Sequence, residues 1–328
     1  MTGGWTYHGG RLAAARAVFG DHPGPWIDLS TGINPDPWRE VDSVEIDWQR
    51  LPEEGALRDL EAAAANHFGA DPANVAALPG TEIGLRLLGD LLTGPAEYRW
   101  PSYRTHAEIF ASSEPVRGIA PKGSGARHLV LANPNNPDGQ QLPAARLLDL
   151  LSELHDHGAW LIVDEAFADA NPRESLTPHV SDDAPLVVFR SFGKFFGLAG
   201  VRLGFVLGPS EIVAACRARL GAWPVSSAAI AIGAAAYRDH EWIAGTRAAL
   251  AGKAAELDAL LSGHGLAAMG QCPLFRLIKT SDAAEAFERL ARQAILTRPF
   301  DYNPEWLRIG LPRDEDEWAR LDRALSRG

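Results

Sequence analysis

Short apolar runs alternate with helical stretches through the first two-thirds of the chain, and this alternation restricts the fold more than any other feature. The runs have the length of strands and lack the alternating polar positions of a half-exposed strand. The apolar runs are 75–78, 129–132, 160–163, 186–189 and 203–207, and helical periodicity covers 53–68, 81–92 and 143–157. Buried runs separated by helices predict a parallel sheet covered on both faces, which is an α/β architecture.

The pattern changes after Pro209, where a second region begins. Helical segments and then short strand-like runs follow, as is typical of a smaller α+β domain. The helices are expected at 211–220, 227–237 and 242–261, and the strands at 275–278 and 307–310. The first forty residues are rich in Gly, Pro and Trp, and we expect them to be extended or irregular. These features predict an N-terminal arm at 1–40, a large domain at 41–209 and a small domain at 210–328.

The charge balance argues against whole classes of partner. Lys and Arg number 31 against 42 Asp and Glu, a formal net charge of −11, which disfavours binding to nucleic acid or to an anionic membrane. Cys216 and Cys272 form neither a CxxC motif nor metal-ligand spacing, so we expect reduced thiols and no metal site. The N-terminus lacks a signal-peptide pattern and no apolar run has the length of a membrane span, so we expect a cytoplasmic protein.

Chemistry-bearing residues follow the predicted strands. In an open α/β sheet, ligands bind beyond the carboxyl ends of the strands. After the run at 75–78, Gly80-Thr81 opens a helix whose free N–H groups can bind an anion, although Gly-Thr before a helix is also an ordinary N-cap. After the run at 129–132, the segment 133–139 contains three asparagines and two prolines, which form a rigid turn, and this turn is either an ordinary surface β-turn or part of a site.

Asp164 directly follows the run at 160–163. A carboxylate after a buried strand is costly unless it is paired. The protonated pyridine nitrogen of a cofactor is a natural partner, because a negative charge there holds that proton. The alternative is an aspartate that caps the next helix.

Lys194 is one of only four lysines and lies in a segment rich in Phe and Gly, at 190–202. Desolvation lowers the pKa of an ammonium group and makes the amine a usable nucleophile toward an aldehyde. Ser191 and Arg202 in the same segment can bind a phosphate. The alternative is a structural lysine whose ammonium group reaches solvent along an apolar surface.

Taken together in this order and spacing, these residues resemble the aminotransferase superfamily of pyridoxal-phosphate enzymes, in the class I/II branch that includes histidinol-phosphate aminotransferase. The resemblance covers nearly the whole chain. It implies a large domain with a mostly parallel seven-stranded sheet, a small α+β C-terminal domain, and a homodimer with active sites at the interface. The implied cofactor is pyridoxal 5′-phosphate.

The resemblance also implies a role for each residue of the motif. Lys194 forms a Schiff base with the cofactor, Asp164 pairs with its pyridine nitrogen, and Asn136 binds its phenolic oxygen. Tyr103 stacks on the ring, and Arg308 clamps the α-carboxylate of the substrate. The residues implied to hold the cofactor phosphate are Gly80, Thr81, Ser191 and Arg202, with Glu82 beside them.

Three positions depart from the family pattern. Phe167 stands where the family usually has Tyr, and Leu51 stands where a Tyr often reaches the cofactor phosphate of the partner subunit. Gly193 stands where Ser or Thr is frequent. Each departure removes a hydroxyl group that the family directs at the cofactor.

The N-terminus distinguishes branches of the family. The motif at 8–11, His-Gly-Gly-Arg, and the segment 27–35 resemble the threonine-phosphate decarboxylases of the cobalamin pathway. The resemblance implies decarboxylation of O-phospho-L-threonine to (R)-1-amino-2-propanol phosphate, with His8, Gly32 and Asn34 beside Arg308 in the substrate site. The alternatives are a transaminase acting on histidinol phosphate or another amino acid, and a non-catalytic cofactor-binding relative. His8 itself is equally compatible with a surface histidine in a mobile terminus.

Overall fold

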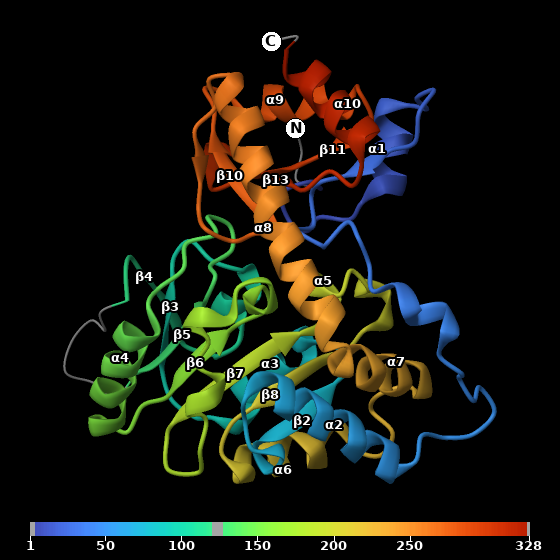
Figure 1. The fold of residues 1–328 in the computed structure, drawn as a ribbon. Helices are drawn as coiled ribbons and strands as arrows, with labels where there is room; N and C mark the ends of the chain where they lie inside the picture. The colour runs from blue at the N-terminus through green and yellow to red at the C-terminus, as the bar shows by residue number, and fades with distance from the viewer. Residues whose placement is uncertain (1–3, 120–126, 327–328) are drawn as a thin grey trace. The chain divides into compact units, whose positions relative to one another are not determined.

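The computed structural model describes residues 4–119 and 127–326, and Lys122 lies outside these ranges (Figure 1). The chain divides into two compact units. The larger unit consists of Pro37–Asn136 and Gln141–Thr246, and the smaller unit consists of Met1–Asp36, Pro137–Gln140 and Arg247–Gly328. The sequence places its boundaries near residues 40 and 209, whereas the division by contacts assigns the helices that follow Pro209 to the larger unit.

The larger unit is built on a seven-stranded sheet in the order β2-β8-β7-β6-β5-β3-β4. Its strands are β2 (Val75–Leu78), β3 (Ala96–Arg99), β4 (Ser113–Val116), β5 (His128–Ala132), β6 (Leu161–Asp164), β7 (Leu186–Ser191) and β8 (Gly204–Leu207). β8 is antiparallel to both β2 and β7, and the other paired neighbours run parallel. The predicted α/β fold with a mostly parallel seven-stranded sheet is confirmed. The parallel direction inferred from the apolar run at 203–207 is wrong, because an apolar run reflects burial on both faces and not strand direction.

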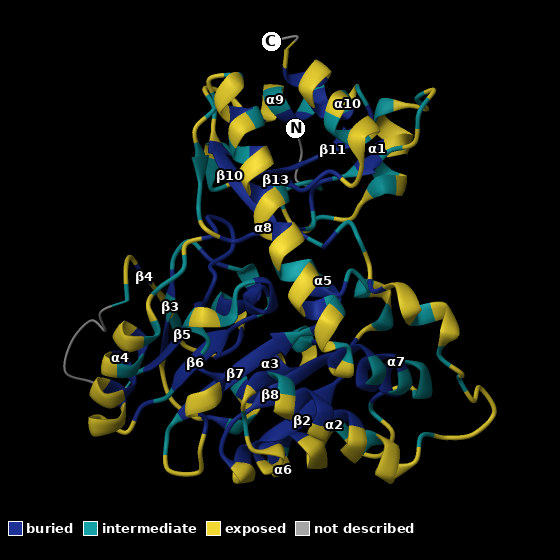
Figure 2. Cartoon of the chain, in the orientation of Figure 1, coloured by how far each residue is buried: buried dark blue, intermediate teal, exposed yellow. Residues whose placement is uncertain are grey.

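Helices cover this sheet and build its core. They are α2 (Glu54–Phe68), α3 (Thr81–Leu91), α4 (Ala144–Asp156), α5 (Phe192–Phe195), α6 (Ser210–Leu220) and α7 (Ser227–Arg238). The short 3₁₀ turns are η1 (Arg39–Ser43), η2 (Pro72–Asn74), η3 (Arg104–Glu108), η4 (Ala168–Ala170), η5 (Pro172–Glu174), η6 (Thr177–His179) and η7 (Ala199–Val201). Leu85 and Leu88 of α3 pack with Val130, Ile162 and Val187 of the central strands, which Figure 2 shows as the buried interior of the sheet.

The apolar-run criterion misses β3 and β4. β3 carries two charged side chains, Glu97 and Arg99, and both are buried. β4 contains Pro115 and lies at the end of the strand order, where a missing N–H costs nothing because no further strand accepts it. Charged residues in β3 and a proline in β4 therefore conceal the last two strands of the sheet order from a search for apolar runs.

The smaller unit is α+β, as predicted. Its strands are β1 (Ile27–Asp28), β9 (Ala268–Met269), β10 (Phe275–Lys279), β11 (Ile295–Leu296), β12 (Arg298–Phe300) and β13 (Asn303–Gly310). They form an antiparallel sheet, β12-β13-β10-β9, and a parallel β1-β11 pair. Its helices are α1 (Leu12–Phe19), α9 (Ala283–Ala291) and α10 (Glu315–Leu325), and α8 (His240–Gly263) begins in the larger unit and continues into the smaller one.

The helix α1 corrects the expectation of an irregular N-terminal arm. Its sequence Leu-Ala-Ala-Ala-Arg-Ala-Val-Phe consists mainly of good helix formers, and the Gly and Pro residues lie outside it. Among the described residues, no helix combines the length and the apolar composition that crossing a membrane requires.

Candidate active site

The topology of the larger unit brings the predicted cofactor residues to one edge of its sheet. β2, β3, β5, β6 and β7 end at this edge, and β8 begins there because it runs in the opposite direction. From β2 across to β3, the residues at this edge are Gly80 and Thr81, Arg202, Ser191 and Lys194, Asp164, Asn136 and Tyr103. Residues that are spread over more than a hundred positions of the chain therefore lie at one edge of the sheet, the edge at which α/β proteins bind their ligands.

The segment after β2 forms a cradle for an anion. Gly80 is the N-cap of α3 with φ +94°, a conformation that favours glycine. A Cβ atom on Gly80 would lie 2.7 Å from Nη2 of Arg202, so the guanidinium group approaches the helix start closely. A Cβ atom on Gly204 would lie 2.9 Å from the backbone nitrogen of Thr81. A helix N-terminus facing an arginine fork is suited to a phosphate group.

Asp164 ends β6 and is buried, at 7% exposed. Its Oδ1 accepts a hydrogen bond from the backbone N–H of Ala166 at 3.0 Å, and its Oδ2 lies 3.2 Å from Nε2 of His106. The other ring nitrogen of His106 lies 3.3 Å from Oγ of Ser102. The carboxylate of Asp164 is therefore held in one orientation by Ala166 and His106.

Sequence reasoning missed His106, which is fully buried in η3. Its signal is weak, because η3 follows β3, a strand that the apolar pattern does not reveal. Its spacing of three residues from Tyr103 would have indicated the same turn once Tyr103 was chosen.

Glu82 and Tyr103 contact each other. The Tyr103 hydroxyl group donates to Oε2 of Glu82 at 3.0 Å, and Thr105 Oγ1 donates to the same oxygen at 2.9 Å. Burial, together with the nearby Glu82 carboxylate, raises the pKa of Tyr103 to about 12. The phenol therefore keeps its proton and remains a donor, which fixes the plane of a ring predicted to stack on the cofactor.

Lys194 lies in α5 between buried phenylalanines, and its Nζ lies 5.6 Å from the centre of the Phe167 ring. The structure explains one departure from the family pattern. A Cβ atom on Gly193 would lie 2.6 Å from the Cα atom of Ala199, so the neighbouring η7 turn leaves no room for Ser or Thr. Phe167 follows β6 and is buried, at 5% exposed.

Asn136 is 8% exposed and lies within the turn 133–139 that follows β5. Asn133 holds this turn, because its Oδ1 accepts from the backbone N–H of Leu142 at 2.8 Å and its Nδ2 donates to the Leu142 carbonyl at 3.1 Å. Asn135 Nδ2 donates to the carbonyl of Pro101 at 3.1 Å, which ties the turn to the segment after β3. These hydrogen bonds fix the turn that carries Asn136.

The predicted substrate residues lie in the smaller unit. Arg308 of β13 is 1% exposed, donates from Nη2 to the carbonyl of Ser30 at 2.6 Å, and stacks on the Phe275 ring at 4.8 Å. Arg298 of β12 is also buried and donates to the carbonyl of Tyr7 at 3.2 Å. Burial and the positive charge of Arg298 both lower the pKa of Arg308, so the pair favours an anionic partner.

The N-terminal residues of this set belong to the same unit and lie outside its helices and strands. Gly32 is buried with φ +62°, and Asn34 is 2% exposed and accepts from the backbone N–H of Asp36 at 3.0 Å. His8 is exposed, with its ring edge-on to Tyr7 at 4.5 Å. A Cβ atom on Gly9 would lie 2.5 Å from the Ser30 carbonyl oxygen, so the two N-terminal segments cross closely.

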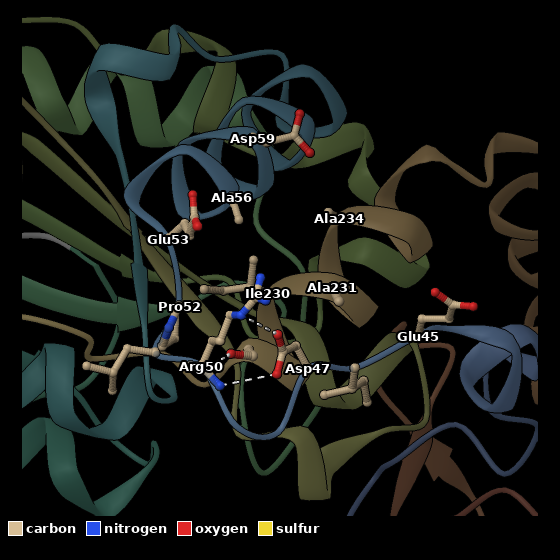
Figure 3. Close-up of a pocket in the computed structure, with 13 residues that line it drawn as sticks. Glu45, Asp47, Arg50, Pro52, Glu53, Ala56, Asp59, Ile230, Ala231 and Ala234 are labelled. Atoms are coloured by element: carbon tan, nitrogen blue, oxygen red, sulfur yellow. Dashed lines mark hydrogen bonds and ion pairs between the residues drawn. The ribbon is translucent and has the colours of Figure 1, made fainter.

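A separate pocket of about 280 Å³ lies in the larger unit around the Arg50-Leu51-Pro52 segment (Figure 3). Arg50 Nε lies 3.5 Å from Oδ2 of Asp47, the ion pair drawn across the pocket in Figure 3. Ile230, Ala231 and Ala234 of α7 form its apolar wall. Leu51 is 63% exposed, and Trp48, three residues earlier, is 77% exposed.

Comparison with known proteins agrees with this architecture. The crystal structure of histidinol-phosphate aminotransferase from Sinorhizobium meliloti in complex with pyridoxal-5′-phosphate superposes with a TM-score of 0.81 at 21% identity, covering 96% of this chain and 93% of that one. This likeness establishes the fold.

The family follows from sequence similarity. The model of the aminotransferase class I and II family matches residues 114–325. A threonine-phosphate decarboxylase of Sinorhizobium sp is 40% identical, covering 98% of this chain and 97% of that protein. A threonine-phosphate decarboxylase of Pseudomonas aeruginosa is 39% identical, covering 97% and 96%. The chain belongs to the class I and II aminotransferase family.

Proposed function

We propose that this protein is a pyridoxal-phosphate-dependent decarboxylase that converts O-phospho-L-threonine to (R)-1-amino-2-propanol phosphate and carbon dioxide for cobalamin biosynthesis. The observation that carries the cofactor chemistry is the convergence of Asp164, Lys194 and Arg202 at one sheet edge. The two threonine-phosphate decarboxylases that match over nearly the full chain support the choice of substrate and reaction.

The larger unit fits pyridoxal phosphate by the chemistry of its donors. The cradle at Gly80, where the Arg202 guanidinium group would lie 2.7 Å from a Cβ atom on the glycine, suits the phosphate group, with Thr81 and Ser191 beside it. Asp164, oriented by His106, would hold the proton of the ring nitrogen. The remaining residues proposed to hold the cofactor are Tyr103 against the ring, Glu82 through Tyr103, Asn136 at the phenolic oxygen and Lys194 at the aldehyde. When bound, the protonated ring supplies an acceptor for the electron pair of the bond that breaks.

The smaller unit would hold the substrate. Arg308 binds the α-carboxylate, and we add Arg298 to the substrate site because it is also buried and because burial, together with the positive charge of Arg298, lowers the pKa of Arg308, an effect that a bound anion would oppose. His8, Gly32 and Asn34 are proposed to bind the substrate phosphate. Two anchors, one for each anionic group, fix the orientation of the bonds at Cα, and that orientation decides which bond breaks.

Lys194 completes the reaction by moving a proton. Loss of the carboxylate as carbon dioxide leaves an electron pair at Cα, and one proton must replace the lost group for the atoms to balance. With the cofactor and substrate bound, the Nζ group of Lys194 would hold that proton and would deliver it to Cα. The buried ring of Phe167 beside Nζ restricts water from this position.

We also propose a homodimer and a cytoplasmic location. Trp48 and Leu51 expose large apolar surfaces beside the pocket of Figure 3, and these surfaces are suited to contact with a second copy of the chain. Light scattering after size exclusion tests the dimer, and Leu51→Glu should shift the mass toward the monomer. A monomeric wild type would contradict the proposed dimer.

The proposed location is consistent with the cysteines. Cys216 and Cys272 are buried free thiols, as expected in a reducing compartment.

The decisive experiment for the reaction supplies phosphothreonine with and without a keto-acid acceptor. We expect carbon dioxide release at the same rate in both, and no glutamate when the acceptor is 2-oxoglutarate. Turnover that requires 2-oxoglutarate and forms glutamate would replace the decarboxylase with a transaminase, the reaction named for the histidinol-phosphate relatives.

A further inference from the structure

A buried ionic cluster lies directly behind the edge of the sheet that carries the cofactor residues. Its centre is Arg190, which is 1% exposed and donates from Nη1 to Oε2 of Glu165 at 2.9 Å and to Oγ of Ser175 at 3.2 Å. Nη2 of Arg190 donates to Asp169. Glu165 is completely buried and also accepts from the backbone N–H of Leu176 at 2.6 Å.

The two ends of the central ion pair are chain neighbours of the cofactor residues. Glu165 follows Asp164, and Arg190 precedes Ser191. β6 and β7 are adjacent and parallel, and the backbone N–H of Glu165 donates to the carbonyl of Phe189 at 2.9 Å. Successive side chains of a strand point to opposite faces, so Arg190 turns inward while Ser191 remains half-buried. The ion pair thus joins the ends of two strands from the side away from the proposed cofactor.

The cluster extends from this ion pair to α2. Asp169 lies 3.0 Å from Nε2 of His67, and the ring of Phe68 covers the Arg190 guanidinium group at 4.7 Å. Thr177 Oγ1 donates to the carbonyl of Phe68 at 2.7 Å. The cluster therefore connects α2, the end of β6, the turns between 168 and 177, and β7.

Stability alone is a weak reason for such a cluster. Removing charged groups from water is expensive, and an apolar set of the same volume often packs equally well or better. The fork of Arg190, however, contacts Glu165 and Asp169 with two different nitrogens, which fixes both positions in a way that apolar packing does not. Directional contacts are useful where the spacing of two strand ends matters.

We propose that Arg190 and Glu165 are positioning residues for the cofactor site. They hold the ends of β6 and β7 at the spacing at which Asp164, Ser191 and Lys194 act on a single cofactor molecule. This inference rests on the proposed function, because it concerns binding of pyridoxal phosphate.

The test compares cofactor affinity with fold stability in matched variants. Glu165→Gln keeps the shape but loses the charge that Arg190 contacts, and Arg190→Lys keeps the charge but loses the fork. The control is Glu61→Gln, because Glu61 is also a buried carboxylate, with bonds to the backbone N–H of Ala77 at 2.9 Å and to Arg217 at 2.8 Å. The unfolding midpoint of the apoprotein and the dissociation constant of pyridoxal phosphate, from an absorbance titration, are measured for each.

We expect both cluster variants to weaken cofactor binding by about tenfold to a hundredfold, the range typical of residues that orient a site ligand. The control should lose comparable stability with less than about a twofold change in affinity, because Glu61 contacts β2 and Arg217 rather than β6 and β7. Wild-type affinity in Glu165→Gln and Arg190→Lys would overturn the inference, and so would failure of both to fold, since the cluster would then serve folding alone. If the wild type itself does not bind pyridoxal phosphate, the proposed function fails and this inference fails with it.

Discussion

The cofactor residues of the larger unit and the arginines of the smaller unit are assembled in different ways. Each cofactor residue lies next to the end of a strand of one sheet, so the backbone topology alone brings the set together. Arg298 and Arg308 instead receive their backbone partners from Tyr7 and Ser30, nearly three hundred positions earlier in the chain. The position of the first set follows from the strand order of the sheet. The position of the second set depends on long-range contacts between the N-terminal segment and strands β12 and β13.

The buried charges of the two sets have opposite signs. The larger unit offers a buried carboxylate, Asp164, with an oriented histidine beside it. The smaller unit concentrates two buried positive charges, which lower the pKa of Arg308. We therefore expect substitutions in the first set to remove chemistry and substitutions in the second to weaken substrate binding.

The largest effect should come from Lys194→Ala. It removes both the amine proposed to hold the cofactor and the proton donor, so we expect turnover to fall by more than about a thousandfold. The protein should also lose the absorbance band of the bound cofactor. Lys279→Ala is the control, because Lys279 is exposed and paired with Glu305. A coloured, fully active Lys194→Ala variant would sink the assignment of the cofactor edge.

The next effect concerns the arginine pair. Arg308→Met should raise KM for phosphothreonine by about a hundredfold or more, because it removes the buried charge that we propose to bind the substrate carboxylate. Arg298→Met should act in the same direction, and either variant should leave the dissociation constant of pyridoxal phosphate within about twofold of wild type. Steady-state kinetics and a cofactor titration separate the two outcomes. A rise in the dissociation constant of pyridoxal phosphate as large as the rise in KM would contradict the distinction between the two sets.

The sequence predicts the first set because its signals are local. The runs at 75–78 and 186–189 match β2 and the core of β7, and the residues that follow them lie at the predicted edge. β3 remains hidden because it carries Glu97 and Arg99, and His106 remains hidden with it. The roles of the individual residues stay predictions.

Long-range pairing is what local patterns do not reveal. Nothing near Arg190 indicates Asp169 as its partner, because burial and ion pairing arise only after β6, β7 and α2 have packed. The same holds for Arg298, whose partner segment begins the chain. Gly193 is the opposite case, because a departure noted in the sequence gains its reason from the close approach of Ala199.

A smaller effect should follow from Glu82→Gln, which tests how firmly the first set is held. Glu82 accepts from Tyr103 and Thr105, and its other oxygen accepts from Arg86 at 2.8 Å. Losing the charge weakens these bonds by about 1 kcal/mol, so we expect about a fivefold loss of cofactor affinity, the size that such an energy allows. Tyr103→Phe should give a similar loss. If Glu82→Gln binds the cofactor as tightly as wild type while Tyr103→Phe does not, the hydrogen bond is not what orients the ring.

The smallest effect concerns the opposite edge of the same sheet, where polar groups should serve stability alone. His128 begins β5, with Nε2 3.1 Å from the carbonyl of Thr93 and Nδ1 accepting from the backbone N–H of Trp160 at 3.1 Å, so only the neutral ring satisfies both contacts. Burial lowers the pKa of His128 below its ordinary 6.5.

This shift predicts how stability depends on pH. Between the lowered pKa and 6.5, the unfolded chain binds a proton that the folded protein does not, so stability is full above about pH 6.5 and falls as the pH decreases. Denaturant unfolding at about pH 7.5 and about pH 5 should show this loss in the wild type and a smaller loss in His128→Gln, with cofactor affinity unchanged at the higher pH. An equal pH dependence in both proteins would assign the loss to other groups, and a drop in cofactor affinity would mean that the two edges of the sheet are not independent.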